Sequence, residues 1–246
     1  MAASQVSDQA SCAFNECSSI ELRGNVDEGA LTRALRKVVQ RNELLRATVD
    51  RQGEQLIIHD QLDPKITKDD WSGLPAADQC RAYEDAVQAE GRTPFDLENG
   101  PLLRVRFQRR AADNYLITFT AHHLIMDGWS LWVFLRDFGH FYSAEISGTE
   151  PNLPPANQYR DYSAAMAEYH ESAEGKADEE FWVNQFQDSI PVLELPTDRS
   201  RPPLKTFDAS RVDHTIDVQL IGELKKIGAK NGCSLFNTML AGFQAF

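Results

Sequence analysis

The segment "TAHHLIMDGWS" (residues 120–130) decides the fold prediction, because it joins the end of one regular element to the start of another. The apolar alternation before it predicts a strand that ends at two adjacent histidines. Gly128 permits a tight turn, and the apolar residues that follow predict a helix. Neighbouring side chains on a strand point to opposite faces. Only one of His122 and His123 can therefore enter a given cavity, and the other must pack inward.

The rest of the chain alternates between helical and strand periodicity, which predicts an α/β protein. Strands are predicted over residues 14–24, 44–50, 54–60, 101–110, 114–123 and 210–218. Helices are predicted over residues 25–42, 74–92, 129–148, 159–172, 176–189, 218–232 and 234–246. Several prolines within 191–206 exclude a regular element there, so we expect an extended linker.

Composition excludes several classes of protein. The chain has 246 residues, a formal net charge of −12 and 42% hydrophobic residues. Such an acidic chain is poorly suited to nucleic acid, and no apolar run approaches a membrane span. Free cysteines and the lack of a visible signal peptide predict a cytoplasmic protein. We interpret a local arginine cluster as a solvated strand edge; its members are Arg104, Arg106, Arg109 and Arg110.

The chemistry of the central segment has two interpretations. Asp127 could cap the next helix, with Ser130 in its first turn. Alternatively, a histidine could serve as a proton acceptor near neutral pH, with its ring ordered by Asp127 and an arginine. Opposed histidines and the lack of an evident third ligand predict no metal site. No nucleophile motif accompanies the pair, which favours direct transfer between two bound substrates.

Four motifs carry a family resemblance. "HHLIMDG" (122–128) resembles the HHxxxDG signature of the condensation domains of nonribosomal peptide synthetases. "RNELLRATV" (41–49) is similar to the family's R-H-E-x-L-R-T-x-F motif, with Asn42 in place of the usual histidine. "PFDLENGPLLR" (94–104) and "LPTDRSRP" (195–202) resemble two further family segments. "ASCAFNE" (10–16) resembles the subgroup that follows polyketide synthase modules.

The resemblance implies a chloramphenicol acetyltransferase-like lobe, with a mixed β-sheet flanked by helices. Residues 1–190 would form the N-terminal lobe, residues 191–209 a linker, and residues 210–246 the start of a truncated C-terminal lobe. The family's first motif is expected before residue 1 and most of the second lobe after Phe246. Such a fragment is expected to be inactive alone.

The resemblance also implies residue roles. His123 matches the residue that deprotonates or positions the acceptor amine, and His122 would be structural. Asp127 would form a salt bridge with an arginine, for which Arg41 is the first candidate and Arg46 the second. The backbone N–H of Gly128 would face the thioester or its oxyanion, and Ser130 would support the site.

The function implied is amide-bond formation between an acyl thioester and an aminoacyl amine. The domain would bind no cofactor of its own, because both substrates arrive on the phosphopantetheine of upstream and downstream carrier proteins. Neighbouring synthetase domains would be further partners. Two alternatives remain open: a stand-alone acetyltransferase-like enzyme that uses acyl-CoA, and a non-catalytic lobe that docks carrier proteins.

Overall fold

The computed structural model describes residues 4, 6–188, 190–192, 194, 196–200, 202–203, 205–207, 212 and 214–245. The chain divides into two compact units, Met1–Phe207 and Asp208–Phe246. The first contains the central histidine segment, and each unit is described by itself.

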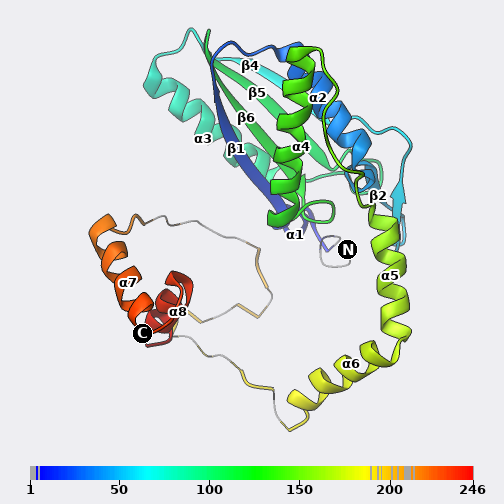
Figure 1. The fold of residues 1–246 in the computed structure, drawn as a ribbon, viewed down its shortest axis with the longest axis vertical. Coiled ribbons are helices and arrows are strands. Elements are labelled where there is room, and N and C mark those ends of the chain that lie inside the picture. The colour runs from blue at the N-terminus through cyan, green and yellow to red at the C-terminus, as the bar shows by residue number, and fades with distance from the viewer. Residues whose placement is uncertain are drawn as a thin grey trace. The chain divides into compact units, whose positions relative to one another are not determined.

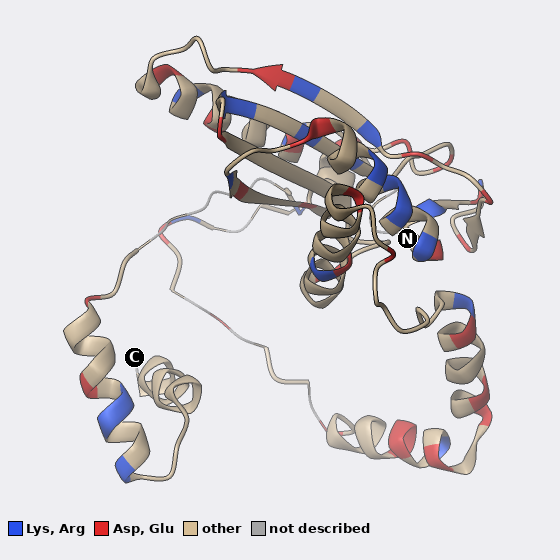
Figure 2. Ribbon diagram, turned by 45° about the horizontal axis from the view of Figure 1, so that its top comes forward, with Lys and Arg blue, Asp and Glu red and all other residues tan. Residues whose placement is uncertain are grey.

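Four of the described strands form one mixed sheet in the order β1-β6-β5-β4 (Figure 1). β1 (Asn15–Arg23) and β5 (Leu103–Ala111) both pair antiparallel with the central β6 (Asn114–His122). β4 (Lys65–Asp70) pairs parallel with β5. The predicted hairpin and the first predicted strand are therefore confirmed. β4 was not predicted, because its exposed, charged sequence has no apolar alternation (Figure 2).

Helices cover both faces of this sheet. α2 (Glu28–Arg41) and α4 (Gly128–Ser147) pack against each other on one face, and α3 (Ala76–Arg92) packs against β1 and β6 on the other (Figure 1). All three helices were predicted from the sequence, α2 from its helical periodicity, and the mixed α/β fold class is confirmed.

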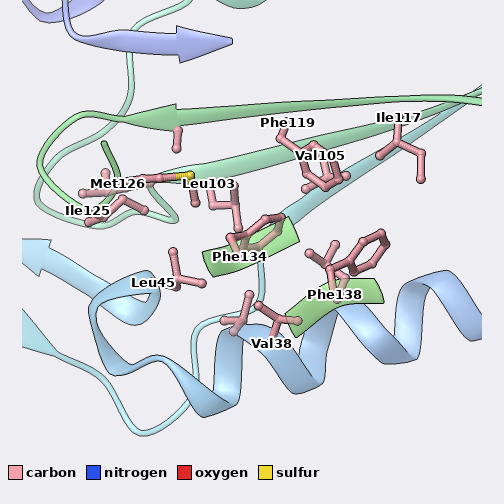
Figure 3. Close-up of a cluster of buried hydrophobic side chains, with 14 of the residues drawn as sticks. Val38, Leu45, Leu103, Val105, Ile117, Phe119, Ile125, Met126, Phe134 and Phe138 are labelled. Carbon is pink, nitrogen blue, oxygen red and sulfur yellow. The ribbon is translucent and has the colours of Figure 1, made fainter. Parts of the chain in front are cut away.

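The hydrophobic core lies between the sheet and the α2–α4 pair (Figure 3). Phe119 of β6 contacts Phe134 and Phe138 of α4, with ring centroids 5.1 and 5.8 Å apart. Burying a side chain of this size contributes about 1.5–3 kcal/mol. The core therefore fixes the end of β6 relative to the start of α4, which is where the histidine segment lies.

The face under α3 is polar. Arg104 of β5 is 8% exposed, and its Nε lies 2.7 Å from Glu90 Oε2. Its guanidinium also lies over the Phe95 ring, 3.8 Å from the centroid. The interpretation of the arginine cluster as a solvated edge is wrong for Arg104, because α3 covers it and supplies a carboxylate.

Smaller elements complete the first unit. α1 (Asp8–Cys12) precedes the sheet, and a 3₁₀ helix (Glu43–Arg46) leads into a two-stranded antiparallel pair, β2 (Ala47–Val49) and β3 (Leu56–Ile58). After α4 come α5 (Tyr159–Glu171) and α6 (Ala173–Gln185). The predictions of β2, β3, α5 and α6 are confirmed, and α1 was not predicted.

The second unit contains α7 (Val218–Lys230) and α8 (Leu235–Ala245), as predicted. The strand predicted over 210–218 is wrong where the structure describes it. Residues 214–217 are irregular, and Asp217 caps α7 through the N–H groups of Gln219 and Leu220. Residues 210, 211 and 213 lie outside the described residues, as do parts of the predicted linker. Among the described helices, none is long and apolar enough to cross a membrane.

Candidate functional site

The two histidines separate as strand geometry requires. β6 ends at His122, which is 1% exposed and packs between the rings of Phe14 and Phe95. Its Nδ1 accepts the N–H of Leu124 at 3.2 Å. Burial lowers the pKa of His122 to about 4, because the charged form is poorly solvated there. His122 is thus a neutral packing residue at neutral pH.

His123 begins the turn after β6, and its side chain is 48% exposed. Its backbone N–H donates to Phe14 O at 2.8 Å, which fixes its position beside β1. Its Nε2 lies 2.9 Å from Glu16 Oε1. Sequence reasoning missed Glu16 as a site residue, because its proximity depends on the register between β1 and β6.

Asp127 caps α4. Its Oδ1 accepts the N–H of Ser130 at 2.7 Å and the Ser130 hydroxyl at 2.6 Å. These two hydrogen bonds hold the pKa of Asp127 below its usual range, and the bond from the Ser130 hydroxyl has the larger effect. Gly128 is the first residue of α4. Its position leaves open space where a side chain would be.

Neither candidate arginine pairs with Asp127. Arg41 Nε lies 2.9 Å from Asp137 Oδ2, in the third turn of α4. Arg46 is buried, and its guanidinium donates to backbone carbonyls, including Val39 O at 3.3 Å. Within the described part of the chain, Asp127 forms no ion pair. The structure thus corrects the expected Arg41–Asp127 and Arg46–Asp127 pairs, because α2 places Arg41 against the middle of α4.

A groove of about 660 Å³ lies beside His123, and we call it the His123 groove. It is lined from three segments, within residues 42–45, 123–134 and 157–162. His123, Asp127 and Ser130 are among its lining residues, whereas Gly128, His122, Arg41 and Arg46 are not. Its walls combine apolar and aromatic side chains, such as Met126 and Trp129, with polar groups.

Glu43 attaches α5 to this groove. It is 3% exposed, and its carboxylate accepts Arg160 N at 2.8 Å and Arg160 Nε at 2.7 Å. The hydrogen bond from the Arg160 side chain is the main reason why the pKa of Glu43 lies below its usual range. Glu43 was not predicted as a site residue, although it lies within the "RNELLR" motif.

Among the residues that the structure describes, no three His, Cys, Asp or Glu side chains converge in a way that could hold a metal ion. The geometry instead brings the exposed imidazole of His123, the carboxylate of Asp127 and the N-terminus of α4 together at the His123 groove. This arrangement can accept or position a proton and can stabilise a developing negative charge.

Comparisons with known proteins identify the family. The family model "Condensation domain" matches residues 1–246. A linear gramicidin synthase from Brevibacillus parabrevis is 35% identical over 94% of this chain, which spans 4% of that protein. Chondramide synthase cmdD from Chondromyces crocatus is 32% identical over 96% of the chain, which spans 6% of it. The chain thus spans only a small part of these relatives.

Solved structures agree with the fold. VibH, described as an NRPS condensation enzyme, superposes with a TM-score of 0.70 at 25% identity over 93% of this chain and 52% of that one. SgcC5 from Streptomyces globisporus superposes with a TM-score of 0.75 at 23% identity, over 95% of this chain and 53% of SgcC5. This likeness shows that the two chains share a fold. Because the family model matches the whole sequence, this chain belongs to the condensation-domain family.

Proposed function

We propose that residues 1–190 form the N-terminal lobe of a condensation domain that makes amide bonds in nonribosomal peptide biosynthesis, and that residues 191–246 are a linker and the start of its C-terminal lobe. The observation that carries the proposal is the exposed imidazole of His123 at the edge of the His123 groove, beside the start of α4. The donor would be an acyl thioester and the acceptor an aminoacyl amine, each on the phosphopantetheine of a carrier protein. The relatives, which are peptide synthetases, support this substrate class.

The reaction balances without a cofactor. The amine nitrogen attacks the thioester carbonyl carbon, a C–N bond forms, and the C–S bond breaks. The proton lost by the amine passes to the departing thiolate, and His123 would accept it or hold the amine in the reactive orientation. Aligning two tethered reactants accounts for much of the rate enhancement in such a reaction.

The start of α4 would stabilise the oxyanion of the tetrahedral intermediate. The backbone N–H groups of a helix N-terminus are free of intrahelical partners and favour negative charge. Asp127 would contribute indirectly, because its bonds to Ser130 fix this first turn next to His123. Carrier proteins and neighbouring synthetase domains would be the partners, and we place the reaction in the cytoplasm.

The test is a condensation assay with both substrates loaded on carrier proteins, in a complete condensation domain that includes this chain. His123→Ala should reduce turnover by about 100-fold or more. His140→Ala is the matched control, because His140 is an exposed histidine of α4 away from the groove. Wild-type turnover by His123→Ala would contradict the proposal. Turnover with free acyl-CoA in place of the carrier-bound donor would also contradict it, because this is the behaviour expected of the acetyltransferase-like alternative.

A further inference from the structure

Gln158 joins two segments of the first unit that lie far apart in the sequence. It is the N-cap residue of α5, yet its side chain makes no capping hydrogen bond. Its Oε1 instead accepts the backbone N–H of Glu43 at 3.2 Å, and its Nε2 donates to Arg41 O at 3.1 Å. Both ends of the glutamine amide are thereby used, one as acceptor and one as donor. Gln158 thus ties the start of α5 to the end of α2, across 117 residues of sequence.

Further hydrogen bonds hold the same segment, residues 154–160, which we call the α5 entry segment. Nη2 of Arg41 donates to the backbone oxygen of Pro154. The Glu43 carboxylate accepts the backbone N–H and the side chain of Arg160. The bonds of Pro154, Gln158 and Arg160 all lead to residues 41–43. The α5 entry segment is therefore fixed at its beginning, near its middle and at its end.

The α5 entry segment leads into one wall of the His123 groove. Tyr159 follows Gln158 directly, and Tyr162 lies one turn later on the same face of α5. The ring centroids of the two tyrosines are 6.1 Å apart, and both residues line the groove. We call this pair the tyrosine wall. Because α5 begins at Tyr159, a shift of its N-cap residue would move both rings. The position of the wall consequently depends on the bonds of Gln158.

The charges around the groove favour an uncharged occupant. The described residues that line it include no lysine and no arginine, but two carboxylates, Glu43 and Asp127. Both carboxylates have pKa values below their usual range, so they are ionised at neutral pH. An acidic group would be repelled by them and would find no cation there. An apolar group would contact the tyrosine wall and the exposed ring of Trp129, which suit its burial.

We propose that Gln158 is a positioning residue that fixes the tyrosine wall, and that an uncharged, apolar side chain of a substrate packs against this wall. The inference deepens the proposed function and rests on it for the substrates. The side chain could belong to the acceptor aminoacyl group or to the donor acyl group, since both share this chemistry. Gln158 acts through Tyr159 and Tyr162, because its own amide is occupied by Arg41 and Glu43.

The first experiment measures which side chains the groove accepts, in a complete condensation domain that includes this chain. Both substrates are loaded on carrier proteins. In one series the acceptor is alanyl, leucyl or aspartyl while the donor stays constant, and in the other series the donor varies in the same way. We expect kcat/KM for leucyl to exceed that for aspartyl by about tenfold or more in one series, which assigns the wall to that substrate. The absence of this preference from both series would overturn the inference.

The second experiment tests the wall and its anchor. Gln158→Leu removes both bonds and should raise KM for the leucyl substrate by about tenfold, while kcat changes by less than about twofold. Tyr162→Ala changes an exposed side chain, so the domain should fold, and the preference for leucyl over aspartyl should fall to about threefold or less. An unchanged KM in Gln158→Leu would refute the positioning role. An unchanged preference in Tyr162→Ala would refute the role of the wall.

Gln79→Leu is the matched control, because Gln79 also bonds to backbone oxygens of other segments, including Trp71 O at 3.0 Å and Arg110 O at 3.1 Å. It belongs to α3 and does not line the groove. A purely structural loss would act alike in both variants, so KM should change in Gln158→Leu and stay constant in Gln79→Leu. An equal rise of KM in the two variants would overturn the inference. The two hypotheses fail separately: normal turnover in His123→Ala refutes the proposed function, whereas the side-chain preference reports on the tyrosine wall.

Discussion

Arg41 Nε lies 2.9 Å from Asp137 Oδ2, and the Asp137 side chain is 1% exposed. Asp137 also accepts from Arg136 Nη2 at 2.8 Å. The carboxylate thus joins the C-terminal end of α2 to the third turn of α4. A buried carboxylate is stable only with such partners. The pair consequently holds together the two helices that cover the core.

A double-mutant cycle tests this assignment. Asp137→Ala should lower the free energy of unfolding by about 3 kcal/mol, because it leaves Arg41 without its carboxylate. Arg41→Ala and Asp137→Ala should show a coupling energy of about 1–3 kcal/mol in urea denaturation. The matched cycle between Arg41 and Asp127 should give a coupling energy within about 0.5 kcal/mol of zero, because these two residues do not pair. A larger coupling to Asp127 would restore the ion pair first expected from the sequence.

Glu43 provides a second test, because it anchors the first turn of α5 through Arg160. Glu43→Gln removes the charge that accepts both Arg160 bonds. Hydrogen bonds to charged groups contribute about 1.5–3 kcal/mol, so backbone amides at the start of α5 should exchange at least about tenfold faster. Hydrogen–deuterium exchange with mass spectrometry measures this.

Glu171→Gln, at the exposed far end of the same helix, is the control and should leave the exchange at the start of α5 unchanged. Unchanged protection in Glu43→Gln would show that α5 is held in place by other contacts.

The sequence predicts those parts of the fold whose pattern is local. β6 alternates as a strand and α4 is strongly apolar after a glycine turn, and strand alternation was enough to separate His122 from His123. β4 could not be found in this way, because Lys65, Lys68 and two aspartates replace the apolar pattern. Its position depends on pairing with β5, which no local pattern encodes.

The same distinction applies to the candidate site. The cap formed by Asp127 is a local feature, and it was one of two interpretations that the sequence allowed. The partners of Arg41 and His123 are not local, since 96 residues separate Arg41 from Asp137 and a strand register brings Glu16 to His123. Motif similarity indicates which residues belong to a site, whereas packing decides which of them meet.

The cap itself leads to a third prediction. Asp127→Ala should lower the free energy of unfolding by about 1 kcal/mol, because the first turn of α4 loses its acceptor. Asp127→Asn keeps an acceptor oxygen, and asparagine caps helices nearly as well, so its stability should lie within about 0.5 kcal/mol of wild type. Urea denaturation measures both. An equal loss in the two variants would show that the negative charge of Asp127, and not the cap, stabilises the turn.

The buried ring of His122 predicts how stability depends on pH. Its pKa is about 4 in the folded chain, mainly because of burial. In the unfolded chain the pKa of a histidine is about 6.5. Between these values the unfolded state binds more protons, so stability falls as the pH falls. This group should lower the free energy of unfolding by roughly 1–2 kcal/mol between about pH 6.5 and pH 5.

His122→Gln is the comparison that isolates this contribution, because glutamine does not titrate. Asp127 and Glu43 have lowered pKa values, so their contributions are lost only below this pH range. Urea denaturation at a series of pH values should give a flatter profile for His122→Gln than for wild type, whatever the absolute stability of the variant. Parallel profiles would show that His122 is already protonated in the folded chain or hydrated there, and that burial does not keep it neutral.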